Sequence, residues 1–224
     1  MKIYLLPAIT PSIPQTKSPD ARLSVPQYLS DITHSICQSL TQSLKHTPFI
    51  TVQTLNPPID QIIPRIQTLT PNTPTSTNCL IAVGLNASTY DGHYHSSHGW
   101  SVCNKVCNKV SGQLAQSLAN AALHTLGPSA ISSPGQIPSQ RYLCWAGLLS
   151  DLPIPAVLTL NLYQDNRQDI AYLLSSAGRQ AIIDLHTKGI TDYLNISQKT
   201  ERPSSTPSSQ CRQKHNHPAG SPDT

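Results

Sequence analysis

Charged residues are scarce in this chain. They make up 12% of its 224 residues, about half of the share that is usual in soluble domains. The net charge of +4 is small, and the basic residues are scattered instead of forming the stripe that a nucleic-acid-binding protein presents. The composition therefore indicates a neutral, polar surface, and we expect no nucleic-acid partner.

Long apolar runs are also missing. The longest, residues 3–9 and 154–162, fall far short of the roughly 20 residues that span a bilayer, so we expect no membrane partner. The first of these runs is interrupted by Pro7, and no cleavage pattern of small residues follows it. The expectation is a cytoplasmic protein that leaves the cell only by lysis or another such route.

The cysteines lack the density of a small disulfide-stapled scaffold. They are spread over the whole chain, as Cys37, Cys79, Cys103, Cys107, Cys144 and Cys211. We interpret them as mostly reduced thiols.

What the sequence does contain is an alternation of strand and helix patterns. β-branched or apolar runs predict strands, and apolar residues at spacings of three and four predict helices. The expected strands are residues 2–6, 49–55, 78–85, 99–102 and 155–162, and the expected helices are residues 28–44, 59–69, 111–126, 166–174 and 176–194. This order is typical of βαβ units and therefore of an α/β domain.

The C-terminal segment has a different composition. Residues 196–224 hold few apolar side chains and many Pro and Ser, so burial there cannot offset the entropy lost on ordering. We expect one domain over residues 1–195 and a disordered Ser/Pro-rich tail over residues 196–224.

Three segments carry a resemblance to a known family. They read GWSV at 99–102, SGQLAQSLANAA at 111–122 and PAVLTLNLYQDN at 155–166. Their order and wording resemble the zinc-dependent N-acetylmuramoyl-L-alanine amidases (amidase type 3), particularly those of Bacteroides-type bacteria and their phages. The resemblance is specific after Asn78 and weaker before it, where Ser18-Pro19-Asp20 and Arg65 contribute. It implies a three-layer α/β fold, with a twisted, mostly parallel sheet and helices on both faces. The activity that it implies is hydrolysis of the bond between muramic acid and L-alanine in peptidoglycan.

The same resemblance locates the zinc site and the catalytic group. Its three ligand positions, a His, a Glu and a second His, fall at Ile9, Val25 and Gly84, and its catalytic Glu falls at Leu160. A catalytic zinc needs three protein ligands and an open position for water, and none of these four residues can supply a ligand or a proton. No His precedes His34 and no Glu precedes Glu201, so a shift of register does not restore the first two ligands, unless Asp20 or Asp31 substitutes for the Glu.

The leading hypothesis is therefore a catalytically inactive amidase homologue without a metal cofactor. Such a protein could bind a peptidoglycan fragment or an active amidase, and Asn86 and Asn161, beside the lost positions, are candidate groove residues. A decaying gene product without a selected function is a further alternative.

An active zinc amidase with relocated ligands is the enzymatic alternative. His93, His95 and His98 follow the central strand, with Cys103 and Cys107 nearby, and an Asp would have to shuttle the proton. Against it, such spacings arise by chance in loops, and the CNKV-CNKV doubling looks like a local duplication.

Other polar and aromatic residues have competing interpretations. Asp165 and Asn166 could be catalytic. The favoured interpretation is that they provide the N-terminal cap and the first-turn charge of the next helix. His215 and His217 form a short tract for which we expect no specific role. The aromatic side chains could line a sugar-stacking groove or pack in the core, and they are Trp100, Trp145, Tyr90, Tyr94 and Tyr163.

Overall fold

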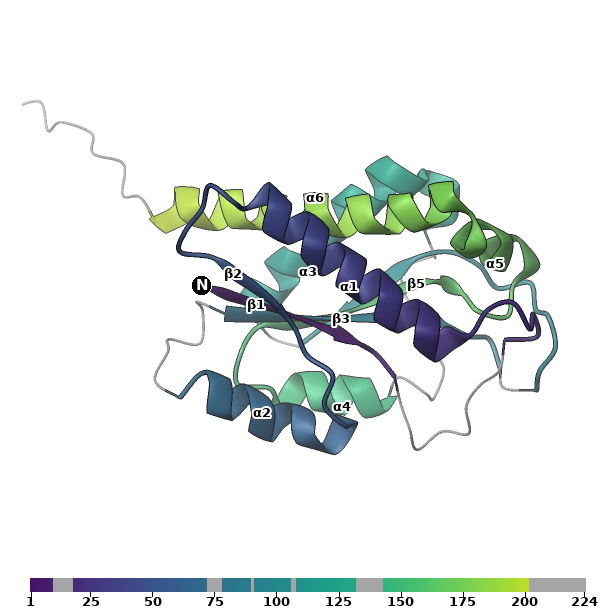
Figure 1. Ribbon diagram of the computed structural model, residues 1–224, viewed down its shortest axis with the longest axis horizontal. Coiled ribbons are helices and arrows are strands. Elements are labelled where there is room, and N and C mark those ends of the chain that lie inside the picture. The colour runs from purple at the N-terminus through teal and green to yellow at the C-terminus, as the bar shows by residue number, and fades with distance from the viewer. Residues whose placement is uncertain (10–17, 72–77, 90, 106–107, 132–142, 202–224) are drawn as a thin grey trace, which may run out of the picture.

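A five-stranded sheet forms the centre of the molecule, with helices on both of its faces (Figure 1). The computed structural model describes residues 1–9, 18–71, 78–89, 91–105, 108–131 and 143–201. The strand order is β2-β1-β3-β5-β4. The first four of these strands are parallel and β4 runs antiparallel to β5, so the predicted mostly parallel α/β sheet is confirmed.

The elements follow the predicted alternation. The strands are β1 (Lys2–Pro7), β2 (Thr51–Thr54), β3 (Asn78–Asn86), β4 (Ser101–Asn104) and β5 (Ala156–Tyr163). The helices are α1 (Val25–Ser43), α2 (Ile62–Leu69), α3 (Lys109–Leu126), α4 (Leu143–Asp151), α5 (Arg167–Leu174) and α6 (Ser176–Glu201), with short 3-10 turns at Ile59–Gln61 and Pro128–Ala130. None of the helices that the structure describes is both long and apolar enough to cross a membrane.

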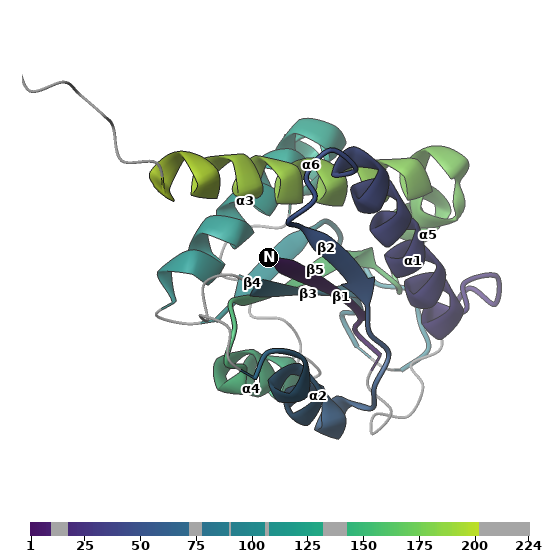
Figure 2. The same cartoon turned by 60° about the vertical axis from the view of Figure 1, so that its left-hand side comes forward.

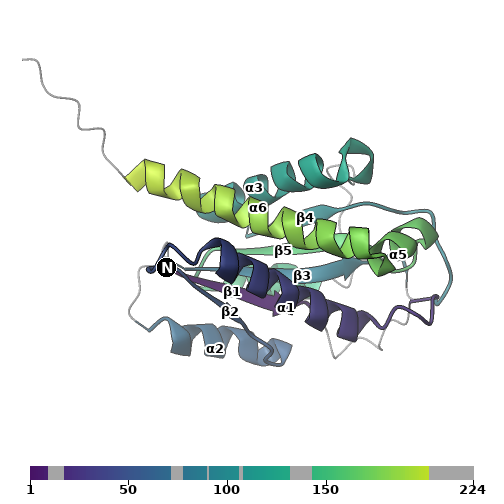
Figure 3. The same ribbon diagram turned by 45° about the horizontal axis from the view of Figure 1, so that its top comes forward.

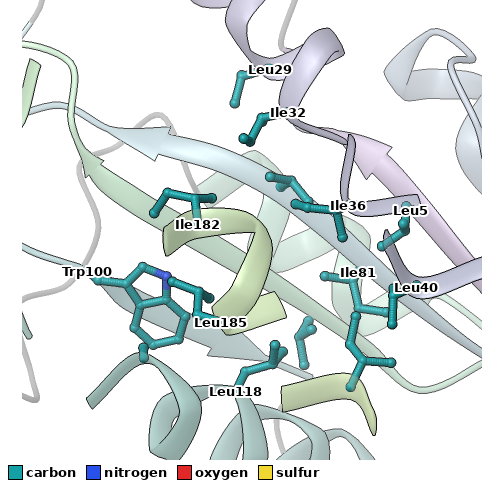
Figure 4. Packing of buried hydrophobic residues seen from close by; sticks show 14 of the residues in the cluster. Leu5, Leu29, Ile32, Ile36, Leu40, Ile81, Trp100, Leu118, Ile182 and Leu185 are labelled. Carbon is teal, nitrogen blue, oxygen red and sulfur yellow. The ribbon is translucent and has the colours of Figure 1, made fainter. Parts of the chain in front are cut away.

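The sheet separates two apolar cores. Figure 2 shows α1, α3 and α6 on one face and α2 and α4 on the other. The larger core joins Ile32, Ile36 and Leu40 of α1 to Leu118 of α3 and Leu185 of α6 (Figure 4). Each of these side chains is almost completely buried, and burying a Leu or Ile side chain stabilises the fold by about 1.5–3 kcal/mol.

The smaller core lies under the opposite face of the sheet. Its helices contribute Ile62 and Ile66 of α2 and Trp145 and Leu149 of α4. Every residue of β3 and β5 is buried, as expected for central strands that are covered on both faces. The two layers of helices complete the predicted three-layer architecture.

Some boundaries differ from the sequence-based expectation. β4 begins at Ser101 because Gly99 has a φ of 104°, which is incompatible with a regular strand, and Trp100 bridges Ile131 instead of pairing with β5. α6 continues to Glu201, so the predicted boundary at residue 195 falls inside a helix that projects beyond the sheet (Figure 3). Residues 202–224 of the predicted tail lie outside the described part of the chain.

Candidate functional site

The carboxyl ends of the central strands are closed by apolar contacts. Leu160 of β5 is completely buried and pairs with Gly84 of the neighbouring β3. A Cβ atom added to Gly84 would lie 3.2 Å from the Cβ of Ala8, which is tighter than normal van der Waals contact. Ala8 and Leu160 belong to the smaller core, so the position expected of a catalytic glutamate is part of that core.

The other two expected ligand positions flank this end of the sheet. Ile9 is half-buried, and its N–H donates to the carbonyl of Pro7 at 2.8 Å. Val25 is the first residue of α1 and is buried in the larger core. Zinc in proteins is held by thiolate sulfur, imidazole nitrogen or carboxylate oxygen. Since Ile9, Val25 and Gly84 have none of these atoms in their side chains, these three positions do not fit a zinc ion.

A distortion of β5 follows the Gly84–Leu160 pair. Gly84 pairs with Leu160 but Asn86 pairs with Tyr163, so β5 holds one extra residue, which is a β-bulge. Leu162, inside the bulge, has a φ of 68°, a left-handed conformation that costs a non-glycine residue about 1–2 kcal/mol. The bulge reorients the chain as it leaves the sheet toward α5.

A chain of hydrogen bonds occupies the opposite face of the same strand. The Trp100 indole donates to Asn161 Oδ1 at 2.8 Å, and Asn161 Nδ2 donates to the Gly84 carbonyl at 3.1 Å. Thr159 Oγ1 lies 2.9 Å from His186 Nε2, whose Nδ1 lies 2.7 Å from the Ile182 carbonyl. A carbonyl only accepts, so Nδ1 carries the proton and Nε2 accepts from Thr159.

The loop between β3 and β4 is fastened by the turn that follows β5. Asp165 Oδ2 accepts from the N–H groups of Ser88 and Thr89 at 2.7 and 3.2 Å. Asp169 Oδ2 accepts from the N–H groups of Gly99 and Tyr163 at 3.0 and 2.8 Å. The two carboxylates therefore hold both ends of the loop against the start of α5.

Solved structures share this architecture. The CwlD amidase from Clostridioides difficile, solved in complex with the GerS lipoprotein, is 15% identical with a TM-score of 0.60, over 87% of this chain and 98% of that chain. An N-acetylmuramoyl-L-alanine amidase from Clostridium difficile 630 is 13% identical with a TM-score of 0.63, over 87% and 96%. The amidase AmiC2 of Nostoc punctiforme is 14% identical with a TM-score of 0.61, over 87% and 97%.

The chain has the fold of the N-acetylmuramoyl-L-alanine amidases. No protein-family model and no curated protein matches its sequence. The similarity therefore lies in the arrangement of the elements, and it extends over nearly the whole length of these three amidases.

On this amidase fold, the three histidines of the relocated-ligand hypothesis lie in the fastened loop. His95 Nε2 lies 3.0 Å from Asp91 Oδ1 and 2.9 Å from Thr89 Oγ1, and the hydrogen bond to Asp91 raises the pKa of His95. His93 and His98 are exposed. Across the described residues, no three His, Cys, Asp or Glu side chains form a group that could hold a metal ion. Cys107, His215 and His217 lie outside those residues.

The candidate groove residues and aromatic residues are mostly buried. Asn86 and Asn161 are 4% and 1% exposed, and Asn86 Oδ1 accepts from the N–H of Ala87 at 3.0 Å. Trp100 lies in the larger core and Trp145 in the smaller one. Tyr163 is buried and Tyr94 is half-buried, while Tyr90 lies outside the described residues.

Asn166 has the structural role that was favoured from the sequence. It is the N-cap of α5, and its Oδ1 accepts from the N–H groups of Gln168 and Asp169 at 2.9 and 3.1 Å. The predicted cap is confirmed. Asp165, in contrast, is directed toward the loop, a role that sequence could not indicate because Ser88 and Thr89 are far away along the chain.

Two arginines near this end of the sheet were not singled out from the sequence. Arg167, the first residue of α5, lies over the Tyr94 ring with its Cζ 3.7 Å from the ring centroid. Arg22 donates to both oxygens of Asp20, from Nε at 2.9 Å and from Nη2 at 2.7 Å. Their residue type alone was no signal, and the contact of Arg167 with Tyr94 joins residues that are distant in the chain.

Proposed function

We propose that this protein binds peptidoglycan stem peptides with an amidase fold and does not hydrolyse them. The observation that carries the proposal is the complete burial of Leu160 against Gly84 at the carboxyl ends of β5 and β3. In this fold, by the resemblance described above, these two positions would hold the catalytic glutamate and a zinc ligand.

Hydrolysis of an amide needs an activated water molecule and a group that moves protons. In a zinc amidase the metal supplies the first by lowering the pKa of its bound water, and a carboxylate supplies the second. Leu160 and Gly84 can do neither, and the tight space around Gly84 leaves no room for a larger side chain there without a shift of Ala8. This arrangement supports a binding protein better than an enzyme.

Retention of the scaffold supports a ligand of the same class. The sheet order, both layers of helices and the fastened loop after β3 form a complete amidase-like domain. The end of the sheet where they meet also holds exposed polar and charged side chains, including Arg22 and Arg167. A surface of this kind can bind a peptide although no reacting group lies beneath it.

A protein partner is the second candidate function. The CwlD amidase, which shares this fold, was solved in complex with a lipoprotein. By analogy, the second candidate is that this chain binds another protein, such as an active amidase, instead of binding the wall directly.

Two measurements on the full chain test the proposal. Calorimetric titration with zinc uses a variant in which Cys211, His215 and His217 are alanine, so that these C-terminal residues do not contribute. We expect no stoichiometric binding at micromolar zinc. In parallel, sedimentation with purified peptidoglycan sacculi is expected to retain the protein and to release no peptide. Stoichiometric zinc binding, or release of peptides from the sacculi, would overturn the proposal, and absence from the sacculus pellet would favour the protein partner.

A further inference from the structure

Segments that are distant in sequence converge at the carboxyl end of the sheet. The turn before α1, the loop between β3 and β4, and the start of α5 lie at the same end of the molecule in Figures 1 and 3. The turn before α1 contributes Asp20 and Arg22, which bond to each other, and the loop and α5 contribute Tyr94 and Arg167, which are in contact. We refer to these four residues as the arginine cluster.

The guanidinium of Arg167 is held in place by the aromatic ring of Tyr94. Its Cζ lies over the Tyr94 ring, 3.7 Å from the ring centroid, which is a cation–π contact. Among the hydrogen bonds of the described residues, none uses the N–H groups of this guanidinium. Arg167 is exposed, and a cation–π contact does not use up N–H donors, so these groups are available to a ligand.

Arg22 is oriented by its neighbour Asp20. The carboxylate accepts hydrogen bonds from Nε and Nη2 of Arg22, and within the described residues no hydrogen bond uses Nη1. Hydrogen bonds from Arg22, and at longer range the charge of Arg167, lower the pKa of Asp20 to about 2. Asp20 is hydrogen-bonded to Arg22 and interacts with the charge of Arg167 at longer range, and the cluster of two cations and one anion retains one positive charge.

Hydrogen bonds hold the chain on both sides of Tyr94. Tyr94 is half-buried in the loop whose ends are held by Asp165 and Asp169. Beside it, the N–H of His95 donates to the carbonyl of Asp165 at 2.8 Å, and the side chain of Asn166 donates to the carbonyl of His95 at 3.2 Å. A loop that is fastened in this way limits the entropy lost when a ligand binds.

We propose that Arg22 and Arg167 form a binding site for a carboxylate-bearing peptide, with Tyr94 supporting Arg167. Guanidinium groups match the geometry of a carboxylate, which can accept two parallel N–H bonds from one of them. The bound carboxylate also neutralises the remaining positive charge of the cluster. The site depends on the proposed function only for the choice of peptide, since stem peptides of peptidoglycan carry free carboxylates.

The test is a titration of the full chain with the tripeptide N-acetyl-L-Ala-γ-D-Glu-L-Lys, in which binding is measured by NMR and calorimetry. The same peptide with both carboxylates converted to amides is the matched ligand. We expect wild type to bind the carboxylate form at least tenfold more tightly, because a hydrogen bond to a charged group contributes about 1.5–3 kcal/mol. The preference is expected to weaken as salt concentration rises.

Variants locate the site. Arg167→Gln and Arg22→Gln are expected to weaken binding of the carboxylate peptide about tenfold each, while Tyr94→Phe retains it because the ring is kept. Arg65→Gln, which removes the same charge from an exposed position on α2, is the control and is expected to change binding less than twofold. Circular dichroism of each variant checks that the fold is unchanged.

The outcomes separate this site from the proposed function. Equal affinity for the two peptides, no binding of either, or equal effects of Arg167→Gln and Arg65→Gln would overturn the site. If the carboxylate peptide binds as expected but the protein does not sediment with sacculi, the site stands and the proposed peptidoglycan binding fails.

Discussion

At the scale of single residues, His186 determines how the core responds to acid. It is completely buried, and burial lowers its pKa to about 4, whereas an unfolded histidine titrates near pH 6.5. The folded pKa is depressed, so the stability contributed by neutral His186 is fully present above pH of about 6.5. It is lost as the pH falls from there toward 4.

The predicted effect is a steep loss of stability in weak acid. The difference in pKa corresponds to about 3 kcal/mol of unfolding free energy between pH 7 and pH 4, measured by urea denaturation at several pH values. His186→Gln does not titrate, so its stability is expected to fall less over this range, although it is lower at pH 7 because the bond to Thr159 is disturbed. The control His124→Gln, at an exposed position, should retain the slope of wild type. A slope in His186→Gln equal to that of wild type would refute the assignment.

The sequence could indicate some of these residue roles and not others. Asn166 was identifiable as an N-cap because capping depends on a local pattern. The left-handed conformation of Leu162 was not, since leucine disfavours it and only the pairing of β5 with β3 imposes it. His186 continues the buried face of α6 at four residues from Ile182, a spacing that predicts burial but not its contact with Thr159.

At the scale of elements, periodicity predicted every strand and most helices, because the central strands and helix faces are buried where their apolar residues recur. The exceptions have local causes. Positive φ at Gly99 moves the start of β4, and α4 (Leu143–Asp151) has no clear apolar face because its sequence is apolar nearly throughout. How the loops meet one another could not be predicted, since those contacts join residues that are distant in the chain.

The crossing of α3 and α6 gives a test of element packing. A Cβ on Gly189 would lie 2.9 Å from the Cα of Leu118, and Ser117 Oγ donates to the Gly189 carbonyl at 2.8 Å. Gly189→Ala must push the two helices apart and is expected to lower the unfolding free energy by about 1–3 kcal/mol. The matched control is Gly112→Ala in α3, where a Cβ meets nothing within 4 Å. This change should stabilise by about 0.5–1 kcal/mol, and the opposite order of the two urea midpoints would contradict the packing.

The carboxylate that fastens the end of the loop gives a second test at this scale. Burial raises the pKa of Asp169 above its usual value, against the lowering effect of the N–H bonds from Gly99 and Tyr163. Its contribution to stability is therefore present below the unfolded pKa and is lost as the pH rises through the folded pKa. Asp169→Asn keeps an oxygen for both N–H groups without a charge. The stability of wild type relative to Asp169→Asn should thus decrease as the pH rises from 3 to 7.

Asp169→Leu provides the control for the hydrogen bonds themselves. It leaves the N–H groups of Gly99 and Tyr163 without an acceptor, and each unsatisfied group is expected to cost about 1–3 kcal/mol. Hydrogen exchange at Gly99 should accelerate in Asp169→Leu and not in Asp169→Asn. If wild type instead gains stability over Asp169→Asn as the pH rises, the raised pKa is wrong.

At the scale of the whole molecule, the two cores meet the carboxyl end of the parallel strands in different ways. The larger core reaches Val25 and packs against Ile9, while the smaller core takes in Ala8 and Leu160. The end where an amidase fold would hold its metal is therefore continuous with the hydrophobic interior on both faces of the sheet. Apolar residues at such positions avoid the penalty of burying unpaired charges, so the proposed non-catalytic function predicts that a charged side chain introduced there destabilises the fold.

A glutamate at the catalytic position expected from the resemblance tests this prediction. Leu160→Glu places a carboxylate at a position with no exposure and no described partner of opposite charge in the surrounding core. We expect a loss of at least about 3 kcal/mol of unfolding free energy at pH 7 and a smaller loss at pH 4, where the carboxyl is protonated. Leu123→Glu, at a side chain that is 49% exposed, should change stability by less than about 0.5 kcal/mol. Added zinc is expected to raise the stability of neither variant, because a single carboxylate beside Ile9, Val25 and Gly84 is not a ligand set. A zinc-dependent rise in the melting temperature of Leu160→Glu would contradict this and mean that this end of the sheet can hold a metal ion.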